Sequence, residues 1–459
     1  MNFLQRAQVV YLLRSNKYEE QAGEIAKVTL IACNERRQYI CCVSNKYGEQ
    51  ASGIAKFTLI FCNERRQYIC CASNKYGEQA SEKSKLALNV TIFLYICHLH
   101  IIFTGMLKLI GNTLDELKEI CAEVGLPSYA AKQIADWIYK KKVRSIDQMT
   151  NISKAFREKL SEKYEVGRTE YADVVISSDG TKKYLFPVER ENGTKLYGIE
   201  AVMIPDKERA TLCVSSQPGC RMACKFCMTG RQGYHGNLDA AEILNQYLEV
   251  DECEALTNTV FMGMGEPLDT WENVKKVIEI LTADYGFGWS PKRITLSTIG
   301  VNFSKDGGIS PLKRFLDECS CHLAVSLHNP FGNERVELMP MEKPFPIEQT
   351  IDLIKQYDFT GQRRVSFEYI MFSGVNDSKR HADALVRLLR GLECRMNLIR
   401  FHKIPDSPLA PSPMPVIEAF KKRLNEAGLL TTLRASRGED ILAACGMLSG
   451  KKKAHTNTK

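Results

Sequence analysis

Residues 211–250 read TLCVSSQPGCRMACKFCMTGRQGYHGNLDAAEILNQYLEV and contain the unit from which the fold is predicted. The stretch TLCVSSQ at 211–217 is typical of a strand, and AAEILNQYLEV at 240–250 has helical spacing. Between them lies a loop with three cysteines, Cys220, Cys224 and Cys227, in the spacing C-x3-C-x2-C. No fourth cysteine is close enough in the sequence to complete a four-thiolate cage.

The same order of strand, loop and helix continues toward the C-terminus. We expect strands in NTVFMGMGEP, RITLSTIG, CHLAVSLHNP, RVSFEYIMFSGVN and RMNLIRFHKI, and helices in WENVKKVIEILTA, IEQTIDLIKQY and HADALVRLLRGL. Strands that alternate with helices of this length predict a parallel sheet. The sequence therefore predicts an α/β fold, a partial (βα)6 barrel similar to a TIM barrel, over residues 206–450. Chemistry in barrels lies at the C-terminal ends of the strands.

A small helical domain is predicted ahead of the barrel, at residues 106–165. It begins with a capping box at Thr113 and Glu116 and continues with helical patterns at 129–142 and 152–164. A hairpin turn at 178–180 marks a linker over residues 166–205. The basic stretch at 140–144 suits contact with an RNA backbone, and a solvated helix face is the alternative.

Residues 1–105 differ from the rest of the chain. Residues 25–52 recur as residues 54–81 with 25 identities in 28 positions, which indicates recent duplication. The piece YICCASNKYGEQASEKSKLAL resembles the last two strands of an immunoglobulin-type domain, but the repeats lack the earlier cysteine and tryptophan of that fold. The apolar run at 86–105 has the length of a membrane span, yet it contains one asparagine and two histidines. We interpret residues 1–105 as a fused or spurious extension that is not a membrane anchor.

Charge and export signals set further limits. The formal net charge is +8, but residues 1–105 contribute +5 of it, so total charge does not support nucleic-acid binding by the barrel. We interpret the basic tail at 451–459 as a solvated terminus. No signal peptide is recognisable at residues 1–14, so we expect a cytoplasmic protein in a reducing compartment, where clustered cysteines favour metal binding or catalysis.

Three interpretations of the cysteine loop are open from the residues alone. A zinc site would need a histidine, and the nearest later one, His235, lies outside the usual spacing. Three buried structural cysteines within eight residues of a loop would be unusual. The remaining interpretation is a [4Fe–4S] cluster in which three irons bind thiolates and the fourth is open to a small molecule.

Several motifs together resemble one family. The loop CVSSQPGCRMACKFCMTGRQGYHGNL is followed in order by FMGMGEPLDTWENV, ITLSTIGV, LAVSLHNPFGNERVELMP and LRASRGEDILAACGML. This order resembles the radical S-adenosylmethionine (SAM) enzymes of the RlmN/Cfr family, which methylate adenine in RNA, over about residues 106–450. The resemblance implies one [4Fe–4S] cluster held by Cys220, Cys224 and Cys227, with SAM bound at the open iron.

The resemblance also implies roles for individual residues. Cys445 matches the cysteine that carries the methyl group, Cys213 matches its disulfide partner, and Glu200 matches the proton acceptor, although Cys213 is an alternative acceptor. The positions that match SAM contacts are Gly265, Glu266, Ser297, Ser326, Leu327, His328 and His402. At His402 many family members have Asn, and Arg400 stands in place of Pro, so this contact differs from the family pattern.

The implied reaction is methylation of C2 of adenine in 23S rRNA and also in tRNA. Two SAM molecules are used per turnover: one methylates Cys445, and the other gives a 5′-deoxyadenosyl radical. We expect an electron donor such as flavodoxin or ferredoxin, an accessory domain that binds RNA, and a monomer. The alternatives are methylation of C8, which the same motifs would serve, and a non-enzymatic scaffold built from the immunoglobulin-like fragments.

Overall fold

The computed structural model describes residues 106–190, 195–302, 307–359, 361 and 363–450, and within residues 1–105 only the backbone of five short strands. The chain divides into two compact units, Met1–Gly105 and Met106–Lys459. Among the described residues no helix is both long and apolar enough to cross a membrane. The apolar run at 86–105 and the basic tail at 451–459 lie outside the described residues.

The strands of the first unit follow the sequence repeat. They are β1 (Val9–Val10), β2 (Lys27–Cys33), β3 (Gln38–Ser44), β4 (Lys56–Phe61) and β5 (Tyr68–Ser73), and they pair antiparallel in sequence order. β2 and β4 occupy matching positions in the two copies of the repeat, as do β3 and β5. Each copy therefore forms one hairpin of a single meander, whereas an immunoglobulin sandwich packs two sheets.

The second unit begins with the predicted small helices. The capping box is confirmed, because the Glu116 N–H donates to Thr113 Oγ1 and the Thr113 N–H donates to Glu116 Oε2. It opens α2 (Leu114–Glu123), and α4 is Lys154–Ser161. The second predicted helix has two parts, α3 (Ala130–Ala135) and a π-helical turn η1 (Asp136–Lys140). The 3-10 turn η2 is Ile146–Gln148, and strands β6 (Leu107–Lys108) and β7 (Tyr164–Glu165) pair at the domain's edge.

The basic stretch of this domain is bound to the protein itself. Lys141 lies over the Trp137 ring at 3.6 Å and pairs with Asp136. Lys142 Nζ donates to the Cys253 carbonyl at 2.9 Å, and Arg144 pairs with Glu249, both in the barrel. The stretch therefore connects the small domain to the barrel, so its availability for RNA is less than the sequence suggested.

One ten-stranded sheet dominates the described part of the second unit. Its antiparallel portion is β8 (Asp173–Ile176), β9 (Lys182–Arg190) and β10 (Lys195–Asp206), with the predicted hairpin turn between β8 and β9. Its parallel portion is β11 (Arg209–Cys213), β12 (Asn258–Phe261), β13 (Ile294–Thr298), β14 (His322–Ser326), β15 (Val365–Met371), β16 (Arg395–Arg400) and β17 (Thr431–Leu433). The predicted α/β fold with a mostly parallel sheet is confirmed. The parallel sheet has one strand, β17, beyond the six predicted.

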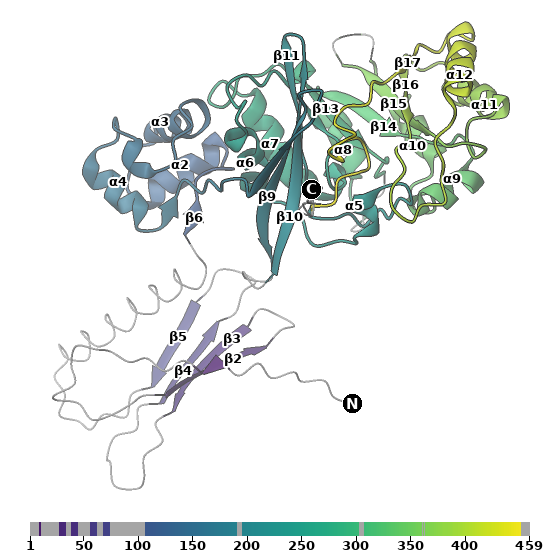
Figure 1. Ribbon diagram of the computed structural model, residues 1–459. Coiled ribbons are helices and arrows are strands. Elements are labelled where there is room, and N and C mark those ends of the chain that lie inside the picture. The colour runs from purple at the N-terminus through teal and green to yellow at the C-terminus, as the bar shows by residue number, and fades with distance from the viewer. Residues whose placement is uncertain are drawn as a thin grey trace, which may run out of the picture. The chain divides into compact units, whose positions relative to one another are not determined.

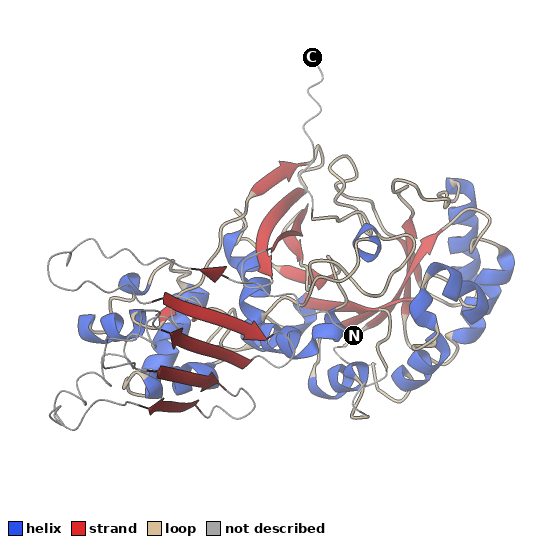
Figure 2. Cartoon of the chain, turned by 90° about the horizontal axis from the view of Figure 1, so that it is seen from below, coloured by secondary structure: helices blue, strands red, loops and turns tan. Residues whose placement is uncertain are grey.

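Helices cover the outer side of this curved sheet (Figures 1 and 2). All four predicted barrel helices are present: α6 (Ala240–Glu249) after the cysteine loop, α7 (Trp271–Thr282), α10 (Ile347–Ile354) and α11 (Lys379–Leu388). Helices α8 (Pro311–Glu318), α9 (Gly332–Leu338) and α12 (Met414–Glu426) were not predicted. Short elements complete the unit: α5 (Met228–Arg231), η3 (Pro267–Thr270), η4 (Pro291–Arg293) and η5 (Pro340–Glu342).

The two faces of the parallel sheet differ in chemistry. Phe367 and Tyr369 of β15 are fully buried on one face, and Tyr369 stacks on Phe420 of α12. The opposite face carries Glu368, which β-register aligns with Ser326 and Asn397. Because side chains alternate along a strand, apolar residues face the helices and polar residues line the inside of the curve. The inner face and the strand ends are therefore where the site should lie.

Candidate active site

The cysteine loop follows β11 and ends in the short helix α5, whose N-cap is Cys227. Its path depends on close backbone packing. Gly219 has φ +110°, and a Cβ there would lie 2.2 Å from the Gly233 carbonyl oxygen. A Cβ on Gly230 would lie 3.0 Å from the Cys224 amide nitrogen. The loop is therefore compact because glycine occupies both positions.

The three thiols of this loop suit an iron–sulfur cluster. Cys220 and Cys224 are each 8% exposed, and all three side chains are free cysteines. Burial, followed by the nearby Cys227, raises the pKa of Cys224 to about 12. In the described part of the chain no three His, Cys, Asp or Glu side chains are spaced to hold a single metal ion. Thiolates that bind different irons of one cluster lie farther apart than the ligands of one ion, so this spacing does not conflict with a cluster.

His235, the histidine considered for a zinc site, has other contacts. Its Nε2 lies 3.1 Å from the Gln232 carbonyl oxygen, and its ring stacks on Tyr197 with 4.4 Å between centroids. The His235 ring is therefore held by Gln232 and Tyr197. The metal ligands that the loop offers are its three thiols.

The segment that carries Cys445 lies against this loop. Residues 434–450, here called the C-terminal segment, return from β17 toward α5 and β10, as the yellow chain in Figure 1 shows. The Met228 N–H donates to the Gly446 carbonyl at 2.8 Å, and a Cβ on Gly446 would lie 3.8 Å from Cys227 Cα. Cys445 itself is exposed. The residue predicted to carry the methyl group is thus next to the predicted cluster ligands.

Cys213 and Cys445 are neighbours although 232 positions separate them. Burial, and after it the Cys445 thiol, raise the pKa of Cys213 to about 12, while the Arg434 guanidinium acts in the opposite direction. Cys445 is in turn the largest cause of a raised pKa at Arg434. Cys213 and Cys445, the two cysteines predicted to pair in a disulfide, therefore interact electrostatically with each other and with the Arg434 guanidinium.

Arg434 was missed by the sequence analysis. Its Nη1 donates to Met262 Sδ at 3.3 Å and lies 3.9 Å from Glu368 Oε2. Glu368 is 4% exposed; its Oε1 accepts from Asn397 Nδ2 at 2.8 Å, and its Oε2 accepts no hydrogen bond. The sequence placed Arg434 in the motif LRASRGEDILAACGML, 11 residues before Cys445. An arginine that follows a strand matches no functional spacing pattern, so the sequence did not indicate its role.

Glu200 lies on β10 with its side chain 2% exposed. Its Oε2 accepts from the Ser449 N–H at 2.6 Å and the Gly450 N–H at 2.9 Å, and its Oε1 lies 2.8 Å from Lys183 Nζ. The structure thus places the predicted proton acceptor against the end of the C-terminal segment, with both carboxylate oxygens bound by protein groups.

Gly265 and Glu266 follow β12, and their backbone is set by the protein. Gly265 has φ +101°, and a Cβ there would lie 2.7 Å from Gln217 Cβ. Glycine is thus needed there for close packing against Gln217, which follows β11. Glu266 Oε2 accepts from the Ile299 N–H at 3.0 Å, and burial raises the pKa of this carboxyl to about 7.

Ser297, Ser326 and Leu327 lie where β13 and β14 end. Both serines are half-buried on the inner face, and Leu327 is fully buried. The carbonyls of Ser326 and Leu327 each accept from Arg335 at 2.8 Å. Arg335, which is 1% exposed, also opposes the rise in the pKa of Cys224.

His328 is a buried neutral histidine beneath the cysteine loop. It has φ 55°, its Nδ1 accepts from the Ile370 N–H at 3.0 Å, and burial lowers its pKa to about 3. Its ring packs edge-on against Phe226, with 4.9 Å between centroids. Asn376, which the sequence analysis did not single out, fixes this turn, because its Nδ2 donates to the His328 carbonyl at 2.7 Å.

His402 contacts the C-terminal segment. Its Nε2 lies 2.8 Å from Ser436 Oγ, and its Nδ1 lies 2.9 Å from Glu439 Oε1. Both ring nitrogens therefore have protein partners. The predicted SAM contact at His402 stays a prediction, and in this arrangement the residue joins the loop after β16 to the loop after β17.

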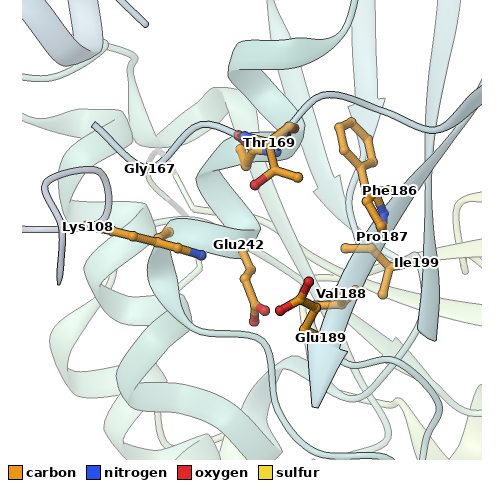
Figure 3. Close-up of a pocket in the computed structure, with 11 residues that line it drawn as sticks. Lys108, Gly167, Thr169, Phe186, Pro187, Val188, Glu189, Ile199 and Glu242 are labelled. Atoms are coloured by element: carbon orange, nitrogen blue, oxygen red, sulfur yellow. Dashed lines mark hydrogen bonds between the residues drawn. The ribbon is translucent and has the colours of Figure 1, made fainter. Parts of the chain in front are cut away.

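A cavity of about 270 Å³ lies elsewhere, between the small domain, the β9–β10 hairpin and α6 (Figure 3). Lys108, Glu189 and Glu242 line it, and Glu242 is already paired with Arg190. None of the predicted site residues is among those that line it. The cavity is therefore separate from the cysteines and strand ends described above.

Comparison with known proteins agrees with this geometry. The model of the ribosomal RNA large subunit methyltransferase N-terminal domain matches residues 107–166, and the radical SAM superfamily model matches residues 214–385. The chain is 57% identical over 344 residues to the probable dual-specificity RNA methyltransferase RlmN of Porphyromonas gingivalis strain W83, covering 75% of this chain and 97% of the relative. The chain belongs to the RlmN family. It is an enzyme of the radical SAM methyltransferase type.

More distant members agree. The dual-specificity RNA methyltransferase RlmN of Syntrophus aciditrophicus is 41% identical over 344 residues, covering 74% of this chain and 95% of that one. A crystal structure of a radical SAM methyltransferase from Sphaerobacter thermophilus superposes with a TM-score of 0.67 at 36% identity, covering 75% of this chain and all of that chain. Radical SAM superfamily membership implies a [4Fe–4S] cluster and SAM, and the three buried thiols supply a suitable donor set.

Proposed function

We propose that the chain methylates C2 of an adenine in 23S rRNA and in tRNA. Family membership at 57% identity over nearly the whole of a relative supports the enzyme class. The observation that carries the proposal is the meeting of Cys213, Cys445 and the cysteine loop at one strand end. A methyltransferase that acts by simple displacement from SAM would need none of these extra thiols.

We assign the residues as follows. Cys220, Cys224 and Cys227 would hold one [4Fe–4S] cluster, with SAM contacts at Gly265, Glu266, Ser297, Ser326, Leu327, His328 and His402. When bound, the cluster and one SAM supply a 5′-deoxyadenosyl radical, and a second SAM supplies the methyl group, so two SAM are used per turnover. A one-electron donor such as flavodoxin or ferredoxin would reduce the cluster. The chain would act as a monomer.

Cys445 would carry the new carbon. Its thiolate forms a bond to the methyl group of SAM as the sulfonium carbon–sulfur bond breaks. The methyl on Cys445 would then lose one hydrogen atom to the 5′-deoxyadenosyl radical, and its carbon would bond to adenine C2. Direct displacement is unsuited to this position because C2 is an electron-poor carbon. The adenine has to leave its stack to reach the thiol, as enzymes that act on base atoms require.

Cys213 would release the product. The sulfur–sulfur bond between Cys213 and Cys445 forms as the bond from the Cys445 sulfur to the carbon breaks, and the carbon stays on the RNA. The hydrogens of C2 and of the Cys213 thiol leave as protons, and the new methyl group takes up one proton. One electron is also released, which the oxidised cluster would accept when bound. Glu200 and Cys213 are the two candidates for taking the C2 proton. Two electrons and two protons must then reduce the disulfide before the next turnover.

Nucleoside analysis tests this function. The full chain, reconstituted anaerobically with iron and sulfide, is incubated with SAM, a one-electron reductant and either unmodified 23S rRNA or unmodified tRNA. Digested RNA should contain a nucleoside that co-elutes with 2-methyladenosine and not with 8-methyladenosine, from both RNAs. Methylation of C8 would identify the other branch of the family, and the absence of methyladenosine from both RNAs would refute the proposal.

A further inference from the structure

The end of the C-terminal segment is bound by one buried carboxylate. The amides of Ser449 and Gly450, four and five residues after Cys445, both donate to Glu200 Oε2. At the same place the backbones of Gly450 and Gly198 meet, because a Cβ on Gly450 would lie 2.0 Å from the Gly198 carbonyl oxygen. The segment therefore ends in direct contact with β10, two residues from Glu200.

Lys183 completes this contact. Its Nζ lies 2.8 Å from Glu200 Oε1 and also donates to the Leu442 carbonyl at 3.3 Å. The lysine side chain is 11% exposed and the glutamate side chain 2% exposed. A buried ion pair is maintained only when both charges have good partners, and removing one partner leaves the other charge uncompensated. The pair thus holds the segment on both sides of Cys445, at Leu442 and at Ser449–Gly450.

This arrangement leaves Glu200 poorly suited to accept a proton from the RNA. A carboxylate has about four acceptor sites, and the three N–H donors occupy three of them. A general base has to approach the proton that it removes to within hydrogen-bond distance. Glu200 could do so only if the C-terminal segment, which carries Cys445, moved away first.

We propose that Glu200 and Lys183 are positioning residues that hold Cys445 beside Cys213 and the cysteine loop, and that Glu200 is not the proton acceptor. The inference rests on the proposed function only in giving Cys445 the methyl group. It leaves the Cys213 sulfur, after the loss of its own thiol proton, as the acceptor of the C2 proton. Other contacts act with the pair: Thr229 Oγ1 donates to the Leu448 carbonyl at 2.8 Å, and Gln232 Nε2 donates to the Ser449 carbonyl at 2.7 Å.

The first test measures how fast Cys213 and Cys445 join when the full chain, without SAM or RNA, is treated with a mild thiol oxidant. The disulfide is quantified by peptide mass spectrometry. Glu200→Ala should slow its formation about tenfold, because three bonds to a charged group are lost. Glu189→Ala is the matched control, since Glu189 is an exposed glutamate of the same hairpin, and it should leave the rate unchanged. An unchanged rate in Glu200→Ala would overturn the proposal.

The second test separates positioning from proton transfer. In the double variant Glu200→Gln with Lys183→Met, the amide oxygen still accepts from Ser449 and Gly450 and no unpaired cation remains, but the amide does not take up a proton. We expect disulfide formation to slow by no more than several-fold, because only the Lys183 contacts are lost, and RNA methylation to fall by no more than the same factor. If methylation falls about a hundredfold or more while the disulfide rate is kept, Glu200 is the acceptor and the proposal is wrong. If the parent chain itself methylates no RNA, the proposed function fails while the disulfide test still reports on positioning.

Discussion

The cysteine loop and the C-terminal segment lie against each other, yet the protein holds them by different means. The loop is compact through its own glycines and through Phe226, which packs on His328 and Phe372. The segment has little structure of its own and is fixed by groups from distant elements, among them Glu200 and His402. The geometry of the cysteine loop thus depends on residues close together in the sequence. The position of the C-terminal segment depends on residues far away in the sequence.

The largest effect should come from the loop. Replacing any one of Cys220, Cys224 or Cys227 by alanine should reduce iron to background after anaerobic reconstitution and lower RNA methylation by on the order of a thousandfold or more. Iron and sulfide analysis checks this. Cys319→Ala is a control, because Cys319 follows α8 and lies outside the loop. Normal iron content in a loop variant would separate that cysteine from the cluster.

Replacing the two relay cysteines should divide the reaction into two stages. Cys445→Ala should carry no methyl group on the protein and make no product, because the carbon has no sulfur to bind. Cys213→Ala should still load the methyl group and bond to RNA, but without release, so a covalent protein–RNA species should accumulate on denaturing gels. Equal product from Cys213→Ala and the parent chain would contradict the assigned role. Iron content should be normal in both, which separates them from the loop variants.

Matched glycine substitutions sharpen the comparison further. Gly219→Ala places a Cβ 2.2 Å from a backbone oxygen at φ +110°, so it should destabilise the loop by about 1–3 kcal/mol and lower iron content. Gly446→Ala meets its nearest atom at 3.2 Å, at φ +82°, and should cost about 1 kcal/mol. The second variant should retain iron and slow disulfide formation instead. Thermal unfolding and iron analysis of both variants measure the difference, and equal iron loss would mean that the two regions are held alike.

The smallest effect concerns acid stability beneath the loop. Burial lowers the pKa of His328 to about 3, so the folded chain keeps this imidazole neutral while the unfolded chain binds a proton below about pH 6.5. The unfolded state then binds more protons, and the free energy of unfolding falls as pH falls from about 6.5 toward 3. His328→Asn keeps an acceptor for the Ile370 N–H and tolerates the positive φ.

In His328→Asn the free energy of unfolding should therefore depend less on pH in this range, by up to about 1.4 kcal/mol per pH unit. Urea unfolding of the full chain at pH 7 and pH 5 measures it. An unchanged difference between the two pH values would show that His328 does not titrate as the buried geometry requires.

The sequence predicted what depends on local spacing. The alternation of strands and helices, the capping box at Thr113, the hairpin turn and the cysteine loop are all present. β17 was missed because its three residues have too little pattern, and α12 was missed because prolines precede it. Arg434, Lys183 and Asn376 were missed because each acts through contacts across tens or hundreds of residues. The SAM contact at Gly265 stays a prediction, and the close packing of this glycine on Gln217 is a contact that no spacing reveals.

The most direct test of the relay is a disulfide map of the cluster-bound full chain. With Cys220, Cys224 and Cys227 engaged by the cluster, mild oxidation should give one predominant linked peptide, in which Cys213 is joined to Cys445. Digestion and mass spectrometry identify the pair, which needs Cα atoms within about 7 Å. A Cys445 that stays free, or that pairs only with cysteines other than Cys213, would contradict the account.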